Sequence, residues 1–366
     1  MNVPKLRFKE FNDEWKKAQL SSIVDINPKN DSLPKKFIYI DLESVNNGLL
    51  TSRKLINKCE APSRAQRTIK KNDILYQTVR PYQMNNLFIN NLDSEYPYIA
   101  STGYALLRTK ENPYFVYSIL YQKTFVNKVL DKCTGTSYPA ISANDLGSII
   151  VGFPSIKEQE KISRTFELLD KKIELQSKKV EDLKLFKLSK YNSVFSKSNN
   201  IIKLSDICKI EKGKQINNDL LREEGNYYMM NGGILPSGYL NEYNTNENTI
   251  TISEGGNSCG YVNFNKTKFW CGGHCYKIIS SSIKTSYLYH LLKYNEKIIM
   301  DLRVGSGLPN IQKKDLEELK LSIHKNDDQL KIGILFDTFD KKINLENNRL
   351  NKFKELKKGL MQSMFA

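Results

Sequence analysis

Apolar residues recur at alternating steps of four and three along two long segments of the chain. In the first segment they are Ile162, Phe166, Leu169, Ile173, Val180 and Leu183, and in the second Ile332, Phe336, Phe339, Ile343, Leu350 and Phe353. This spacing is a heptad seam, so it predicts two long helices that each bury one stripe. We expect them over about 157–197 and 326–366. No Pro or Gly interrupts residues 157–196, so the first helix would be roughly 60 Å long.

The two segments are copies of one sequence. Residues 305–366 align without a gap on residues 135–196 at a constant offset of 170, and 18 of the 62 positions are identical. A repeat of this length indicates one structural unit used twice. The stretches before each copy, roughly 15–134 and 200–304, match far less. The pattern therefore indicates a duplicated scaffold that carries two different parts.

Each apolar stripe needs a partner, and the two copies can bury their stripes against each other. If each helix follows an equivalent globular unit, a pseudo-two-fold arrangement requires the helices to run antiparallel. The seam is polar at Gln176 aligned with Glu346, at Lys187 aligned with Lys357, and at Lys190 aligned with Leu360. Polar seam positions cost stability but fix the register. The alternative is a coiled coil that only dimerises the protein.

The rest of each half is rich in β-forming residues and turns. We expect strands at 37–40, 74–79 and 104–107 before a helix at about 113–131, and strands at 249–252, 261–264 and 276–279 before a helix at about 285–302. The starts correspond weakly, with Leu20, Ile23 and Ile26 resembling Leu204, Ile207 and Ile210. Each half then reads as a mixed sheet, a helix, a short strand and a long helix, which is an α+β layout. The resulting boundaries are 1–154, 155–199, 200–323 and 324–366.

Charge points to a polyanionic partner. The 366 residues include 56 Lys and Arg against 40 Asp and Glu, a formal net charge of +16. Such an excess favours nucleic acid, because each neutralised phosphate releases counterions. A lysine-rich background would give the same charge, and an anionic membrane surface would also suit it, but no basic amphipathic terminal helix is present.

The chain also lacks the segments that direct proteins to membranes or out of the cell. There is no signal-like apolar run at the start and no stretch of about 18 apolar residues, and the six cysteines are unevenly spaced. We therefore expect a reduced cytoplasmic protein with free thiols and no membrane partner.

Motifs for catalysis and metal binding are weak. Neither phosphate-binding glycine motif occurs, and all three histidines, His274, His290 and His324, lie in the second half, so no equivalent acid–base site can exist in both halves. Acidic-x-Lys triplets such as residues 318–320 would suit a nuclease but are expected by chance in a chain this rich in Lys. The cluster at 271–275 could bind zinc with Cys259, but its spacing is irregular, so we expect a glycine turn with buried thiols and no metal.

Polar and basic groups in turns are better candidates for reading DNA. In the first unit they are Arg64, Arg67, Thr78, Arg80, Tyr82, Gln83 and Asn85, around a Pro turn at a strand end. In the second they are Lys212, Lys214, Ser253, Glu254, Asn257, Lys266 and Lys268, around a glycine turn. Arg suits guanine or phosphate, Gln and Asn suit adenine, and Lys suits phosphate. The alternative for each segment is a solvated loop.

Several segments of the chain are distinctive: residues 154–162, the Asp-Lys-Lys-Ile segments at 170–173 and 340–343, and residues 357–365. In these segments the chain resembles the DNA-specificity subunits of type I restriction-modification systems, and the resemblance extends over nearly its whole length. Residues 78–82 and 100–103 also look like common segments of that family. The second copy departs from the pattern at its helix entry, where His324 replaces the Pro and Asp328-Gln329 replaces Glu-Gln.

The resemblance implies a non-catalytic subunit. In that family each variable unit is a target-recognition domain that reads half of a bipartite site, here 1–154 and 200–323. The helices act as spacer and as docking surface for two methylation subunits, which carry S-adenosylmethionine and flip out the adenine. Restriction subunits join to cleave unmodified double-stranded DNA. Two target-recognition domains with different sequences imply an asymmetric DNA target. The alternatives are a stand-alone DNA-modifying or DNA-cleaving enzyme, and a coiled-coil scaffold without DNA contact.

Overall fold

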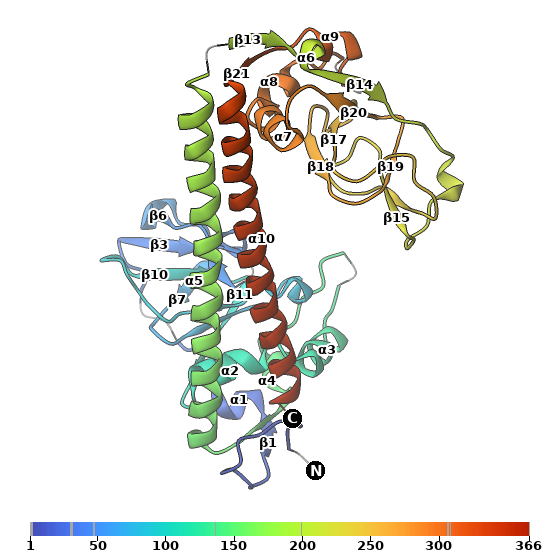
Figure 1. Cartoon of the computed structure of the whole chain (residues 1–366). Helices are drawn as coiled ribbons and strands as arrows, with labels where there is room; N and C mark the ends of the chain where they lie inside the picture. The colour runs from blue at the N-terminus through green and yellow to red at the C-terminus, as the bar shows by residue number, and fades with distance from the viewer. Residues whose placement is uncertain are drawn as a thin grey trace. The chain divides into compact units, whose positions relative to one another are not determined.

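A computed structural model describes residues 3–29, 32–46, 48–135, 137–198, 200–305, 307 and 309–365 (Figure 1). The chain forms two compact units. Unit 1 comprises residues 1–175 and 349–366, and unit 2 comprises residues 176–348. The four boundaries expected from the sequence stay predictions, and two of their ends, Asn199 and Ala366, lie outside the described residues.

Two long helices correspond to the two heptad segments. Helix α5 runs over Ile156–Phe195 and α10 over Asn326–Ser363, so both expected helices are confirmed to within three residues at each end. Asp170 and Lys172 of α5 contact Lys357 and Phe353 of α10 in unit 1. Residue numbers thus rise along one helix as they fall along the other, which means that the two segments run antiparallel there.

The same direction holds in unit 2, where polar groups on the two helices meet. Gln176 Nε2 donates to Glu346 Oε2 at 2.7 Å, and Lys187 Nζ lies 2.5 Å from Asp340 Oδ1. Lys179 Nζ also reaches Glu346, 2.9 Å away, although only 4% of the Glu346 side chain is exposed. A buried carboxylate without partners would cost several kcal/mol, so these contacts offset the polarity of the seam.

Unit 1 is built on two four-stranded sheets, with strand orders β6-β3-β10-β7 and β2-β11-β8-β9, and on the strand pairs β1-β12 and β4-β5. Its strands are β1 Lys16–Gln19, β2 Val24–Ile26, β3 Lys36–Ile40, β4 Val45–Asn46, β5 Leu49–Leu50, β6 Lys54–Asn57, β7 Ala65–Thr68, β8 Ile74–Gln77, β9 Leu87–Phe88, β10 Tyr98–Ser101, β11 Tyr104–Thr109 and β12 Ile150–Phe153. Its short helices are α1 Leu20–Ile23, α2 Pro113–Ile119, α3 Lys123–Asp131 and α4 Ala143–Gly147.

Unit 2 repeats part of this plan. Its sheets have the orders β14-β20-β17-β18 and β16-β15-β19, with the strand pair β13-β21. Its strands are β13 Asn200–Lys203, β14 Cys208–Lys212, β15 Tyr227–Met230, β16 Gly238–Leu240, β17 Thr249–Ser253, β18 Val262–Asn265, β19 Trp270–Cys271, β20 Cys275–Ser281 and β21 Lys320–Ile323, and its short helices are α6 Leu204–Ile207, α7 Thr285–Tyr294, α8 Glu296–Asp301 and α9 Lys313–Glu317. The first sheet and the strand pair match those of unit 1, whereas the second sheet does not.

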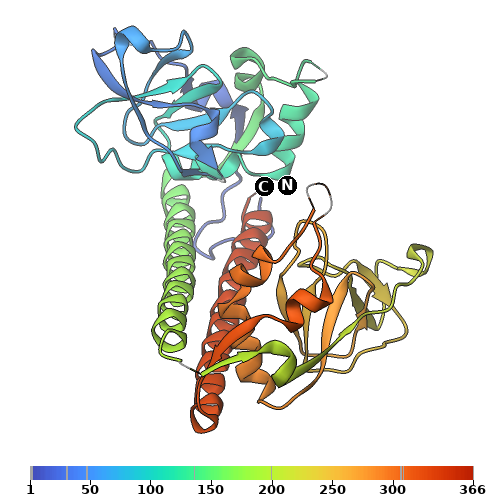
Figure 2. The same cartoon turned by 90° about the horizontal axis from the view of Figure 1, so that it is seen from above.

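One helix in each unit lies between the repeated sheet and a long helix. In unit 2, α7 packs on β17 and β18, and Ser286 at its start donates to Asp337 of α10 (Figure 2). In unit 1, the Tyr114 hydroxyl of α2 donates to Asp170 of α5, and the Tyr114 ring packs on Phe88 of β9. These two helices therefore connect the sheet of each unit to the helical scaffold.

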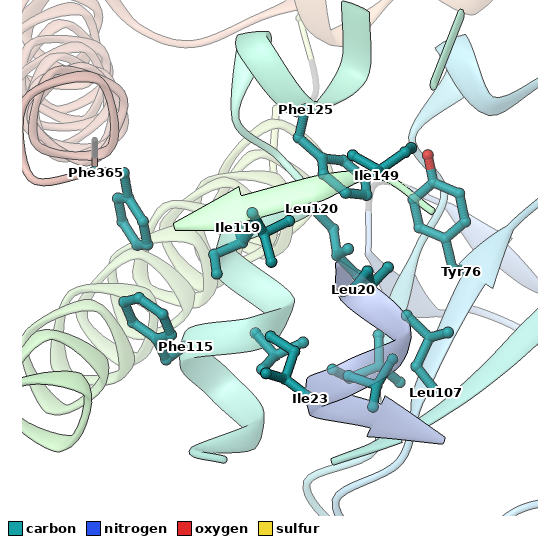
Figure 3. Packing of buried hydrophobic residues seen from close by; sticks show 14 of the residues in the cluster. Leu20, Ile23, Tyr76, Leu107, Phe115, Ile119, Leu120, Phe125, Ile149 and Phe365 are labelled. Atoms are coloured by element: carbon teal, nitrogen blue, oxygen red, sulfur yellow. The ribbon is translucent and has the colours of Figure 1, made fainter. Parts of the chain in front are cut away.

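The core of unit 1 gathers around α1, α2 and the end of the chain. Leu20 and Phe115 are fully buried, and the Phe365 ring stacks on Phe115 with centroids 5.4 Å apart (Figure 3). Phe195, which aligns with Phe365 in the repeat, contacts Tyr287 of α7 in unit 2 in a tilted arrangement, with centroids 6.0 Å apart. Burial of one such ring stabilises a fold by about 1.5–3 kcal/mol, so the duplicated scaffold keeps one anchoring aromatic in each unit.

Two helices predicted to be continuous are each divided into two. The helix expected over 113–131 is two helices, because the backbone at Gln122 is extended and turns Phe125 of α3 back into the core. The helix expected over 285–302 divides at Asn295, whose backbone leaves the helical conformation and whose side chain and N–H both donate to the Leu291 carbonyl. The strand expected over 74–79 ends at Gln77.

Candidate nucleic-acid interface

Loop 78–86 of unit 1 follows β8 and lies against residues 139–141, next to the bridge between Thr134 and Ala140. The Arg80 N–H donates to the Pro139 carbonyl at 2.7 Å, and the Ile141 N–H donates to the Thr78 carbonyl at 3.0 Å. The bridge between Thr134 and Ala140 is short and antiparallel. The loop that carries most of the unit 1 candidates is thus held at its start by the segment that opens the sequence repeat.

Loop 254–262 of unit 2 has the same backbone contacts. The Gly256 N–H donates to the Pro309 carbonyl at 3.0 Å, and the Ile311 N–H donates to the Glu254 carbonyl at 2.8 Å. Val304 and Asn310 form the equivalent bridge. Residues 78–80 therefore correspond to residues 254–256, although their sequences share no identity. The structure brings both sequence-predicted loops to equivalent places in the two units.

The third residue of each loop has a left-handed backbone. Arg80 has φ 53° and Gly256 has φ 78°. Glycine adopts this conformation freely, whereas an arginine there costs of order 1–3 kcal/mol, and such strain is typical of functional positions. The Arg80 guanidinium also lies over the Tyr138 ring, 4.3 Å from its centroid, and Tyr138 is 65% exposed. Arg80 and Tyr138 thus form a cationic, planar surface at the edge of unit 1.

A buried side chain that the sequence interpretation missed organises loop 78–86. Gln77 is 1% exposed, and its Nε2 donates to the Val79 carbonyl at 2.8 Å and to Gln83 Oε1 at 2.9 Å. Its Oε1 accepts from the Asn85 N–H at 3.1 Å. In the sequence, nothing distinguishes a glutamine at the end of a β-rich stretch from the other polar residues. Its role depends on contacts six to eight residues away.

The other unit 1 candidates differ in availability. Tyr82 and Gln83 are exposed, while the Thr78 hydroxyl already donates to the Gly103 carbonyl. Arg64 is exposed, and its carbonyl accepts a hydrogen bond from the Thr102 N–H. Thr102 precedes Gly103, whose carbonyl accepts from Thr78, so the basic segment 64–67 lies next to loop 78–86. Arg67 is half-buried, and burial lowers the pKa of its guanidinium, which stays charged near neutral pH.

Two unit 2 candidates are less available than the sequence suggested. Ser253 is 2% exposed at the end of β17, so its hydroxyl is not free to contact DNA in this conformation. Glu254 is mostly buried and holds Lys212 Nζ at 2.5 Å, which neutralises the charge expected to meet a phosphate. His274 Nδ1 lies 3.8 Å from the same carboxylate. Asn257 is exposed beside Gly256 and is the polar side chain of this loop best placed for a base.

The remaining basic candidates lie on neighbouring turns of unit 2. Lys214 and Lys266 are exposed, and Lys268 Nζ lies over the Tyr243 ring, 4.6 Å from its centroid. Lys268 also donates to the Tyr243 hydroxyl at 3.2 Å. The hydrogen bond to Tyr243 raises the pKa of Lys268, so this cation is fully charged at neutral pH.

The segment at 271–275 is the glycine turn expected between two strands. Cys271 ends β19, Cys275 begins β20, and both thiols are buried. The Gly232 N–H donates to Cys275 Sγ at 3.1 Å. Over the described ranges, no group of three or more His, Cys, Asp or Glu side chains is placed to hold a metal ion.

All twelve apolar residues of the predicted helix seam are buried or half-buried. Phe166 and Phe336, at equivalent positions of the two copies, are both 0% exposed, while Ile173, Leu183, Phe339 and Phe353 are half-buried. Their burial distinguishes this stripe from the exposed leucines on the same helices.

An α+β scaffold that occurs twice, with unlike loops at equal positions, defines a protein with two related recognition units. The family described as the type I restriction modification DNA specificity domain matches residues 12–185 and 197–355. The chain therefore belongs to this family, which confirms the resemblance drawn from its motifs.

Individual relatives agree with this assignment. The chain is 32% identical over 167 residues to a putative type I specificity subunit from Mycoplasma pneumoniae, a match that covers 44% of each chain. It is 28% identical over 172 residues to the HindI specificity subunit of Haemophilus influenzae, covering 45% of this chain and 37% of that one. The matched region is thus less than half the length of these curated relatives.

Solved structures share the fold. A type I restriction-modification S subunit from M. genitalium superposes with a TM-score of 0.69 at 21% identity, over 100% of this chain and 99% of that one. A second structure, from work on the assembly and conformational transition of a type I system, has a TM-score of 0.60 at 20% identity and covers 96% of this chain and 97% of that one. In the parts of the chain that the structure describes, no helix is both long and apolar enough to cross a membrane.

Proposed function

We propose that this chain is the specificity subunit of a type I restriction-modification complex, and that it binds an asymmetric, bipartite site in double-stranded DNA without catalysing a reaction itself. Loop 78–86 with Tyr138 would read one half-site, and loop 254–262 the other. The observation that carries the proposal is the equivalence of the two loops, which differ in chemistry at Arg80 and Gly256. Equal geometry with unlike side chains suits two different half-sites.

The two long helices would form one antiparallel coiled coil that acts as the spacer between the readers. Gln176 and Glu346 support this, because they occupy equivalent repeat positions and bond to each other, as residues on a pseudo-two-fold axis would. The ion pairs Lys187–Asp340 and Lys357–Asp170 are also equivalent to each other, and both measure 2.5 Å. The half-sites would then be contacted about one turn of DNA apart, roughly 34–36 Å.

Exposed leucines on the two helices suit a second role, as docking surfaces for two methylation subunits. Leu175 and Leu345 occupy equivalent repeat positions and are 58% and 52% exposed, on helices whose seam is buried. Each equivalent surface would dock one copy of the partner. The methylation subunits would carry S-adenosylmethionine, and restriction subunits would join them in the cytoplasm to cleave unmodified DNA.

Single-molecule sequencing of genomic DNA methylation, in the host with and without this gene, tests the proposal. Loss of adenine methylation at one gapped, asymmetric motif is the expected result, and it would also give the target sequence. Unchanged methylation, with the partner methylation subunit shown to be expressed, would contradict the specificity role. Binding of S-adenosylmethionine by the isolated chain would instead favour a stand-alone enzyme.

A further inference from the structure

Helices α2 and α7 place corresponding residues on the repeated sheet of each unit. Phe115 and Tyr287 are both fully buried and both contact the equivalent aromatic of the scaffold. With these two in register, Tyr117 corresponds to Tyr289, and Tyr121 corresponds to Lys293. The correspondence is invisible in the sequence repeat, which begins only at residue 135.

In unit 1 the end of α2 and the turn that follows it, where Tyr121 lies, hold the far end of loop 78–86. The Tyr121 hydroxyl donates to the Asn86 carbonyl at 3.1 Å, and the Tyr117 hydroxyl lies 3.0 Å from that of Tyr121. The Tyr117 ring packs on Phe88, which follows the loop, with centroids 5.7 Å apart. Gly48, with φ +76°, backs onto the pair so closely that an added Cβ would lie 2.9 Å from the Tyr117 hydroxyl.

In unit 2 a different side chain makes the equivalent contact. Lys293 Nζ donates to the Val262 carbonyl at 3.0 Å, and Val262 corresponds to Asn86 when loops 78–86 and 254–262 are aligned. The Tyr289 ring packs on Phe264, the counterpart of Phe88, with centroids 5.3 Å apart. Glu296 accepts from the Val262 N–H at 2.8 Å and from Lys293 Nζ at 2.5 Å, so the N–H and the carbonyl of Val262 both bond to side chains.

We propose that Tyr121 and Lys293 are positioning residues that fix the far end of each recognition loop, and that each sets base discrimination at one half-site only. The inference rests on the proposed function. Each loop is bound at its start to the repeated segment, through the carbonyls of Thr78 and Glu254, and at its end to the turn after α2 or to α7. Base contacts require a fixed loop, whereas phosphate contacts tolerate movement.

The chemistry of Tyr121 and Lys293 agrees with a role as permanent hydrogen-bond donors to the loops. Burial raises the pKa of Tyr121 to about 12, so its hydroxyl keeps the proton that it donates at physiological pH. Lys293 has its ammonium group over the Tyr261 ring, 4.0 Å from the centroid, and beside Glu296, which keeps it in place. Two unrelated donors at one position, aimed at one carbonyl, indicate that the hydrogen bond matters more than the residue type.

The test uses the full-length chain, expressed with its methylation subunits, and reads the methylated motif by sequencing. Tyr121→Phe should relax the consensus in one half of the motif, and Lys293→Met should relax it in the other half. A loss of about fivefold in discrimination at the affected half is expected, the equivalent of one hydrogen bond of about 1 kcal/mol. Total methylation should fall much less.

Two matched controls remove the same kinds of group elsewhere in each unit. Tyr98→Phe removes a hydroxyl from β10 that bonds to Asp93, and Lys297→Met removes a charge from an exposed position of α8. Neither should change the motif. If Tyr121→Phe lowers the melting temperature of the chain appreciably, Tyr117→Phe is tested in its place. The Tyr117 hydroxyl lies 3.0 Å from that of Tyr121, so its removal disrupts the same network.

The outcomes separate this inference from the function on which it rests. An unchanged consensus in both halves for Tyr121→Phe and Lys293→Met, with a clear motif for the natural chain, overturns the positioning role and leaves the function intact. Relaxation of both halves by either variant also overturns it, because the effect would then be general. A natural chain that directs no motif overturns the proposed function.

Discussion

At the scale of single residues, the least expected finding is an arginine where its counterpart is a glycine. Arg80 adopts φ 53° and stacks on Tyr138, and the buried Gln77 supports the surrounding loop. The strain at Arg80 is retained although glycine would relieve it. A side chain held in an unfavourable backbone conformation supports the proposal that its guanidinium contacts DNA.

Arg80→Ala should weaken recognition of one half-site and leave the other intact. The loss of a bidentate guanidinium contact is worth about 1–3 kcal/mol of discrimination at one base pair. Competition binding with duplexes altered in either half-site measures it. Arg53→Ala is a control of equal charge, because Arg53 pairs with Asp93 at an exposed site. Unchanged affinity and site preference would remove Arg80 from the candidates.

His290 should make unit 2 less stable in mild acid. It is fully buried, with Nδ1 at 2.7 Å from the Tyr191 hydroxyl and Nε2 at 3.1 Å from Asp337, and burial lowers its pKa below 6.5. The unfolded chain therefore gains a proton before the folded one, so stability is complete above about pH 6.5 and declines as the pH falls below it.

Urea unfolding at pH 7.5 and 5.5 measures this effect. His290→Gln cannot titrate, so the variant should lose less free energy of unfolding between the two pH values than the natural chain does. Equal pH dependence for the two proteins would show that His290 is not responsible.

At the scale of elements, the proposed spacing between the half-sites depends on the two long helices, while the sheets carry the loops. Helix α5 is 40 residues long and α10 is 38. Their polar contacts, such as Gln176 with Glu346, bond specific residues to each other, so a shift of one turn would separate the partners. Polar pairs of this kind select one register at some cost in stability.

Deletion of one heptad from each helix, with facing residues removed together, should leave both units folded and abolish joint binding. Seven residues correspond to about 10 Å along a helix. A duplex whose half-sites are about three base pairs closer should therefore recover binding, since each base pair adds about 3.4 Å. Circular dichroism checks the fold, and gel-shift titration checks binding. Survival of binding to the original duplex would refute the spacer role.

The sequence allowed some elements to be predicted and hid others for identifiable reasons. The heptad pattern located α5 and α10 because 3.5-residue periodicity is a strong, local signal. The break at Gln122 was missed because no Pro or Gly marks it. Ser253 looked like a loop residue because Gly255 and Gly256 lie two and three residues after it, but it is buried at the end of a strand. The match between Tyr121 and Lys293 depends on backbone contacts that no residue type encodes.

At the scale of the whole molecule, the charge acts without regard to sequence. The excess of Lys and Arg gives a net charge of +16, and several exposed lysines adjoin the candidate loops of unit 2. Contacts of this kind supply most of the affinity for any duplex, while the loops would supply the preference for one.

Affinity for a non-specific duplex should therefore fall steeply with salt, roughly linearly in log–log form with a slope near −0.9 per phosphate contact. Titration between 50 and 200 mM salt measures the slope for the target and for a scrambled duplex. Lys214→Ala with Lys266→Ala should reduce both slopes by similar amounts and preserve the ratio of affinities. Weak binding at every salt concentration would favour the scaffold alternative.

Gly256 is a position at which one substitution could add a large side chain to loop 254–262. A Cβ added there meets no atom within 4 Å, and the corresponding Arg80 shows that the same turn accepts a large side chain. A single base change in a glycine codon can introduce arginine, at a strain of about 1–3 kcal/mol. Under the proposed function, such a change at position 256 would add a side chain to loop 254–262, through which the second unit could acquire a new DNA preference in one mutational step.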